Sequence, residues 1–110
     1  MNFFQRRKIL KSANYLDLHP FPLCEYEKNE NNLLTVFMPR FNNKTEHIKL
    51  KLDEFGSTCW LLMDGENSVK EIADKLYSKF GEKIQPINER LTKFLTHLYM
   101  QKIIYFKELK

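Results

Sequence analysis

The sequence is poor in the features that define fibrous, linker-like and membrane-spanning chains. Only 3 of its 110 residues are glycine and 4 are proline, which argues against a collagen-like or low-complexity polymer. Apolar runs such as WLLM at residues 60–63 are far shorter than the ~20 residues needed to cross a bilayer. The first ten residues place their basic side chains after aromatic ones and lack the apolar centre of a secretory signal. These absences predict a folded, soluble domain.

Cysteine and histidine are sparse as well. The two cysteines, Cys24 and Cys59, show no CxxC spacing, which favours free thiols in a reducing cytosol over a disulfide framework. His19, His47 and His97 are scattered, without the spacing by which one element supplies two zinc ligands. We therefore expect no metal site, no cofactor and a cytoplasmic location.

The motifs of common enzymes are missing too. The chain has no Gly-rich phosphate loop, no GxSxG and no HExxH. Cys59 has no histidine or aspartate partner placed by the sequence, and cysteine is among the most buried residue types. The sequence thus predicts core packing for Cys59 and a protein that is not an enzyme.

What the chain does have is enough apolar material for one domain, with an uneven distribution of charge. The hydrophobic share is 43% and the net charge is +4. Residues 1–19 hold four basic side chains and one acidic, whereas the rest of the chain is nearly neutral. We predict a basic N-terminal arm over residues 1–21 and a globular domain over residues 22–110.

Three strands are predicted early in that domain. Residues 23–28 and 33–38 are rich in strand formers and flank a turn-prone run of asparagines, which indicates a hairpin. Pro39 is expected to end the second strand, and residues 41–46 read as a polar loop. Residues 48–52 alternate strictly, with lysines on one face. These lysines discourage aggregation at a sheet edge, so the third strand is expected to be an exposed edge.

Helical spacing follows. Asp53 is a plausible N-cap for a first helix that stops near Gly65. Ser68 and Glu71 form a capping box at the start of a second, amphipathic helix that Gly81 closes. Pro86 suits the first turn of a third helix, which reaches Gln101. Residues 103–106 are β-branched and aromatic, as in a short closing strand.

The predicted fold class is therefore α+β. A three-stranded N-terminal antiparallel sheet precedes three helices and a short C-terminal strand, which is the layout of a small winged helix-turn-helix-like domain.

Three segments carry a resemblance to a known family. They read LDEFGSTCWLLMDG at residues 52–65, SVKEIADKL at 68–76 and FLTHL at 94–98. In this order and spacing, the chain resembles the pyrroloquinoline quinone biosynthesis protein D (PqqD-like) family over roughly residues 22–106. Members of that family are also called precursor-peptide recognition elements.

The resemblance implies a peptide-binding module. Such modules hold the leader of a ribosomally made precursor peptide as a strand beside the third strand and the third helix. They present it to a modifying enzyme, often a radical S-adenosylmethionine protein. The peptide-binding residues that the resemblance implies here are His47, Ile48, Lys49, Leu50, Lys51, Arg90, Lys93, Phe94, His97 and Gln101.

The residues themselves are compatible with this role and leave other roles open. An edge strand offers unpaired backbone groups to an added peptide, and lysine and arginine beside it favour an acidic one. One alternative is a nucleic-acid-binding winged helix whose third helix enters the major groove, although that helix carries few basic residues. The other is a scaffold subunit that forms a homodimer through the exposed edge.

Overall fold

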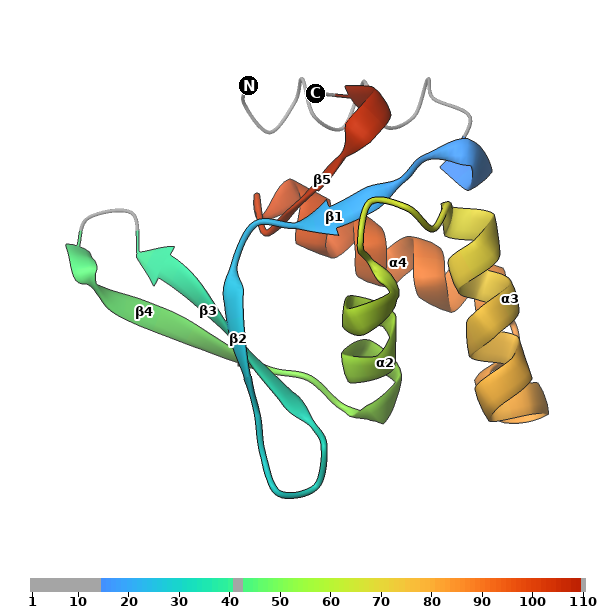
Figure 1. Cartoon of the computed structure of the whole chain (residues 1–110), viewed down its shortest axis with the longest axis horizontal. Coiled ribbons are helices and arrows are strands. Elements are labelled where there is room, and N and C mark those ends of the chain that lie inside the picture. Colours follow the sequence, from blue (N-terminus) through green and yellow to red (C-terminus); the bar gives the residue numbers. More distant parts are fainter. Residues whose placement is uncertain (1–14, 41–42, 110) are drawn as a thin grey trace.

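Helices gather on one side of the molecule, and a long β-hairpin extends away from them (Figure 1). The computed structural model describes residues 15–40 and 43–109, with only the backbone described at 39–40 and 43–47. The elements, in chain order, are η1 (Tyr15–Asp17), β1 (Pro20–Pro22), β2 (Glu25–Lys28), β3 (Leu34–Arg40), β4 (Asn43–Lys51), α2 (Glu54–Leu62), α3 (Val69–Phe80), η2 (Gly81–Ile84), α4 (Ile87–Met100), β5 (Ile104–Phe106) and η3 (Lys107–Leu109). The α+β class, the three helices and a three-stranded antiparallel sheet are as the sequence predicts.

The sheet has the order β2-β3-β4, so β3 is central and both neighbours pair with it antiparallel. Val36 of β3 lies between Tyr26 of β2 and Leu50 of β4 in one cross-strand row. Val36 is completely buried, so this row marks the face of the sheet that points to the core. Side chains at adjacent positions point to the opposite, solvent-facing side.

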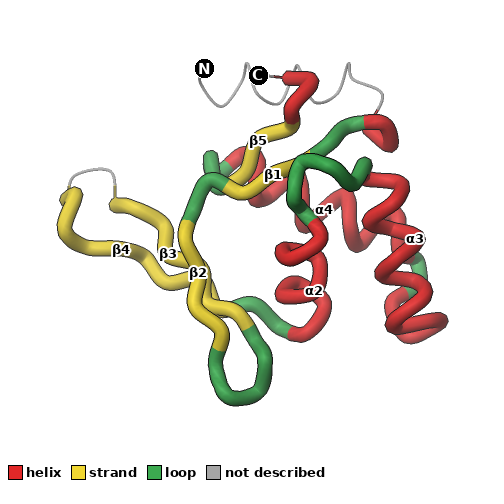
Figure 2. Tube along the Cα trace, in the orientation of Figure 1, coloured by secondary structure: helices red, strands yellow, loops and turns green. Residues whose placement is uncertain are grey.

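The hairpin of β3 and β4 is longer than predicted. Residues 43–46, expected to be a loop, belong to β4, and β3 continues through Pro39 to Arg40, with a register shift between these two residues. The prediction was wrong because residues 43–46 include no apolar residue, so the alternation that signals a half-buried strand is absent. The hairpin extends beyond the helices, where no apolar face is required (Figure 2).

A second, two-stranded sheet was not predicted. The prolines of residues 20–22 indicate an extended stretch, which the structure shows to be β1, paired antiparallel with β5. The backbone of the preceding residues is also tied to the domain: Val69 N–H donates to Leu18 O at 2.8 Å, and Lys107 N–H donates to His19 O at 3.0 Å. Of the predicted N-terminal arm, residues 15–21 thus pack on the domain, and residues 1–14 lie outside the described part.

The starts of α2 and α3 follow the predicted capping chemistry, whereas Pro86, predicted to lie in the first turn of the third helix, is the extended residue just before α4. Asp53 accepts the Gly56 N–H at 2.8 Å and begins α2. At α3, the Ser68 hydroxyl accepts the Glu71 N–H at 3.1 Å while the Glu71 carboxylate accepts the Ser68 N–H at 2.9 Å. Both bonds satisfy backbone donors that have no partner inside the helix. They fix where α2 and α3 begin relative to the strands.

The core is shared by nearly every element. Apolar side chains from β3, all three helices, β5 and the segment before β1 form one buried cluster, so the described residues make a single packing unit. The buried members in the helices include Phe55, Cys59, Trp60, Ile72, Leu76, Leu91, Leu95 and Leu98. Cys59 is completely buried, as predicted, whereas Cys24 is only half-buried.

Candidate functional site

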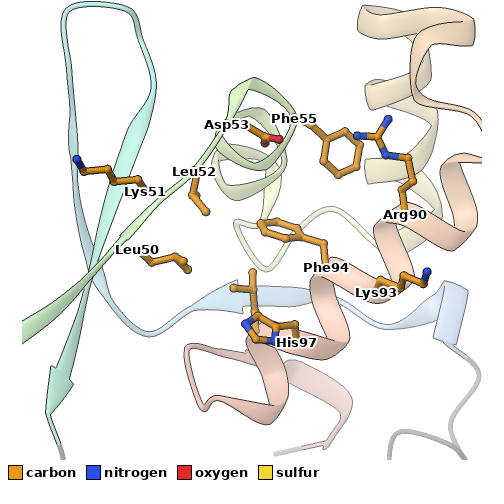
Figure 3. Close-up of a pocket in the computed structure, with 10 residues that line it drawn as sticks. Leu50, Lys51, Leu52, Asp53, Phe55, Arg90, Lys93, Phe94 and His97 are labelled. Carbon is orange, nitrogen blue, oxygen red and sulfur yellow. The ribbon is translucent and has the colours of Figure 1, made fainter.

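A groove runs between the end of β4 and the side of α4 (Figure 3). Its volume is about 550 Å³. Among the described strands, β4 pairs only with β3, so its other edge faces this side without a strand partner. A strand edge beside a helix can accept the backbone of an extended peptide and the side chains that such a peptide presents.

The floor of the groove is apolar. Leu50 and Leu52 come from β4 and the residue after it, Phe55 from the start of α2, and Phe94 from the middle of α4. The rings of Phe55 and Phe94 meet edge-to-face with centroids 6.3 Å apart. Leu52 and Phe55 are buried, whereas Leu50 and Phe94 are half-buried and remain open to an incoming side chain.

Gly56 allows α2 to approach this floor closely. A Cβ atom at this position would lie 3.3 Å from Leu52 Cβ and 3.4 Å from Phe94 Cζ, which is tighter than most real contacts. The glycine weakens the intrinsic helix propensity of α2 by roughly 1 kcal/mol relative to alanine. Because Gly56 has no side chain, Phe94 can pack against the start of α2 and form one side of the groove.

The rim is mainly cationic. Arg90, Lys93 and His97 line it from α4. Lys51 lines it from β4, with its side chain directed to the solvent-facing side of the sheet (Figure 3). Asp53 is the single carboxylate among the lining residues. Asp53 is engaged as the N-cap of α2. The positive side chains therefore dominate the potential that an entering peptide meets.

Arg90 is held in place on two sides. Its guanidinium lies 4.9 Å from the centroid of the Phe55 ring, and Nη1 donates to Lys83 O at 3.4 Å. The planar guanidinium can stack on the aromatic ring and still present donors to a carboxylate. These two contacts orient the Arg90 guanidinium at the rim.

Six of the ten residues predicted for peptide binding line this one groove: Leu50, Lys51, Arg90, Lys93, Phe94 and His97. Ile48 and Lys49 are exposed on β4, farther along the same edge. The backbone of His47 pairs with Pro39 in the hairpin, and its side chain lies outside the described part. Gln101 is the C-cap of α4 and does not line the groove.

The sequence prediction missed four lining residues, namely Leu52, Asp53, Phe55 and Leu98. Each one had a structural assignment in the sequence, either to the apolar side of an element or to a helix cap. A helical or alternating pattern shows that a side chain faces inward, but it cannot show that the inward side borders a groove. Phe55, an aromatic residue close to the predicted edge strand, was the signal in the sequence that could have identified the groove.

A larger hollow, of about 720 Å³, lies against the other side of α2. It is lined by the turn between β2 and β3, the start of α2 and Lys79. Its charges are balanced, with Lys28 and Lys79 against Asp53 and Glu54, and Lys79 already donates to the Thr58 hydroxyl at 3.0 Å. It therefore offers less to an acidic peptide than the groove beside β4.

The described residues contain no cluster of three or more histidine, cysteine, aspartate or glutamate side chains able to hold a metal ion. Burial raises the pKa of the Cys59 thiol far above its ordinary value, so this residue stays protonated and unreactive. Burial also raises the pKa of Cys24. Among the described helices, none is both long and apolar enough to span a membrane.

Comparison with protein families gives one match. The family model described as coenzyme PQQ synthesis protein D (PqqD) matches residues 42–104, which include β4, the three helices and every residue that lines the groove. No curated protein and no solved structure matches the chain.

Proposed function

The chain belongs to the coenzyme PQQ synthesis protein D (PqqD) family, and from this premise we propose that it is a non-catalytic peptide-binding module of the cytoplasm. The ligand is the leader of a ribosomally made precursor peptide, which adds as a strand to β4 and packs on α4. The module presents this peptide to a modifying enzyme, of which a radical S-adenosylmethionine protein is one class. The helices and hairpin together act as a winged helix-turn-helix-like scaffold.

The observation that carries the proposal is the position of an edge strand beside an apolar groove with a cationic rim. Main-chain hydrogen bonds to β4 supply affinity that is independent of sequence, and the groove selects side chains that alternate along the added strand. The half-buried Leu50 and Phe94 provide the apolar contact. Lys51, Arg90 and Lys93 favour a leader with acidic residues.

The test is a titration of the full chain, labelled with ¹⁵N, with leader segments of short peptides encoded near its gene. We expect the backbone amides of residues 48–52 and 90–98 to shift together. A matched peptide with glutamine in place of each acidic residue is expected to bind more weakly. If a leader binds while the amides of residues 48–52 stay unchanged, strand addition to β4 is excluded.

The charge of the rim is tested with one matched pair of variants. Lys51→Glu is expected to weaken binding of an acidic leader by roughly tenfold, because it replaces an attraction at the rim by a repulsion of about 1 kcal/mol. Lys70→Glu makes the same change on the exposed face of α3, away from the groove, and is expected to leave the affinity unchanged. Equal losses in both variants would show that only the net charge matters.

A further inference from the structure

The sheet has a second edge strand, and its charges are opposite to those of β4. Among the described strands, β2 pairs only with β3, so β2 and β4 form the two outer edges. Register places Glu25 and Lys49 at the two ends of one cross-strand row, and Glu27 and Lys51 at the two ends of another. All four side chains are exposed. The solvent-facing side of the sheet therefore has an acidic edge and a basic edge.

Tyr26, which lies between Glu25 and Glu27 in β2, is an exposed aromatic residue on the other side of the sheet. Tyr26 shares its row with Val36 and Leu50, which places it on the core-facing side. Val36 in the centre of this row is 0% exposed, whereas Tyr26 at the edge is 45% exposed. Residues 25–27 of the strand thus present alternating acidic and aromatic side chains, and Tyr26 points toward the side on which the groove of β4 lies. Lys28, the last residue of β2, is exposed on the same face as Tyr26.

We propose that a second copy of this chain adds its β2 to the free edge of β4, so that the sheet of one molecule continues into the sheet of the next. Since β2 and β4 are each antiparallel to β3, they run in the same direction, and a copy in the same orientation forms a parallel pair. In that pair, Glu25 and Glu27 of the second copy lie beside Lys49 and Lys51. Tyr26 of the second copy lies beside Leu50, over the apolar floor.

Symmetric pairing of like edges is opposed by the same charges. Two copies of β4 related by a twofold axis at Leu50 place Lys49 of each copy opposite Lys51 of the other. Two copies of β2 centred on Tyr26 place Glu25 opposite Glu27. Like charges directly across strands destabilise the pair, whereas opposite charges stabilise it. The edges therefore select a head-to-tail contact, which joins two different surfaces and leaves one edge open at each end of a chain of molecules.

This contact regulates the site of the proposed function. If the leader binds as a strand on β4, the leader and a second copy compete for one edge, and self-association lowers the fraction of open sites. A leader with acidic residues that alternate with an aromatic or aliphatic residue has the pattern of β2 itself. The competition rests on the proposed function, whereas the self-association is independent of it.

Sedimentation velocity of the full chain without peptide, over a wide range of concentration, tests the contact itself. We expect reversible association that weakens by at least about tenfold in Glu25→Lys/Glu27→Lys and equally in Lys49→Glu/Lys51→Glu, because each variant turns two attractions into repulsions. The fourfold variant that combines both exchanges is expected to restore association. A chain that stays monomeric throughout, or a fourfold variant that does not recover, overturns the proposal.

Amide shifts on dilution identify the surfaces. Concentration-dependent shifts are expected at residues 25–28 and 48–52 together, whereas shifts at one of these strands alone would show a symmetric contact and overturn the head-to-tail arrangement. The double variant Glu25→Lys/Glu27→Lys leaves the groove intact. Its apparent affinity for the leader is expected to equal that of the diluted wild-type protein. That affinity should no longer depend on protein concentration. Self-association with no leader bound at any dilution would contradict the proposed function alone.

Discussion

Asp64 organises the turn between α2 and α3 through hydrogen bonds to the backbone. Its carboxylate accepts the N–H groups of Glu66 and Asn67 at 2.8 and 2.9 Å. Asn67 is buried and in turn donates to Leu62 O at 3.0 Å, so it joins the turn to the end of α2. Gly65, between them, has a φ of +80°, which side chains rarely adopt. These contacts explain the DG pair within the family-like segment.

The same hydrogen bonds make the stability of the fold depend on pH. The backbone N–H groups of Asn67 and Glu66 lower the pKa of Asp64 below its ordinary value, because they stabilise the charged form. A carboxyl whose pKa is lowered by folding stabilises the native state above its unfolded pKa, near 4, and loses that contribution as pH falls through the folded value. We expect stability to be independent of this group above about pH 5 and to decrease below it.

Asp64→Asn tests this linkage, with urea unfolding measured between pH 7 and pH 3. The variant is expected to lose at most about 1 kcal/mol at pH 7, because the carboxylate is exposed and its interactions are screened. The difference from wild type should diminish at the acid end, where Asp64 itself is protonated. Asp74→Asn, an exposed carboxylate on α3, serves as the control. A constant difference at every pH would mean that the charge of Asp64 does not contribute.

At the scale of elements, β1 and the described residues before it join the first and last described segments of the chain to the helices. Leu18 is 3% exposed and belongs to the core cluster. Its carbonyl accepts the Val69 N–H, and Pro20 O accepts the Gly65 N–H at 3.1 Å. β1 then pairs with β5, which follows α4. Segments from both ends of the sequence thus cover the same end of the helical layer.

Leu18→Ala tests whether these residues belong to the domain. We expect a loss of about 2–5 kcal/mol in the free energy of unfolding, which is the usual effect of removing a buried leucine side chain. Leu16→Ala removes the same side chain two positions earlier, where it is 42% exposed, and is expected to change stability by less than about 0.5 kcal/mol. If both variants are equally mild in a denaturant titration, the domain begins at residue 22, as the sequence predicts.

Elements with local signals were predictable, and those that depend on distant partners were not. The capping box of α3 lies within four consecutive residues, and the edge character of β4 follows from Lys49 and Lys51. The pairing of β1 with β5 joins residues 20–22 to residues 104–106. β1 is only three residues long and two of them are proline, so its sequence does not indicate a strand partner so far along the chain. Phe55 likewise has a helical spacing that predicts burial, and only the packed structure shows that it borders the groove.

At the scale of the whole molecule, the single core links the reactivity of one thiol to global unfolding. Cys59 is 0% exposed and lies within the cluster that includes β3, the three helices and β5. A reagent can reach it only when that cluster opens. Cys24 lies outside the regular elements and is half-buried, so it requires only a local movement. The two thiols therefore report on different scales of motion.

Labelling with a chromogenic disulfide reagent near pH 8 separates the two motions. We expect a fast phase from Cys24 and a much slower phase from Cys59. The logarithm of the slow labelling rate should rise linearly with urea concentration, with a slope that reflects the surface exposed on unfolding. Cys24→Ser should remove the fast phase and leave the slow one unchanged. Fast labelling of Cys59 in native buffer would show that α2 opens without the rest of the core. Because α2 also supplies Phe55 to the groove, such an opening would mean that the groove is assembled only part of the time, and leader affinity would then increase with any variant that stabilises α2.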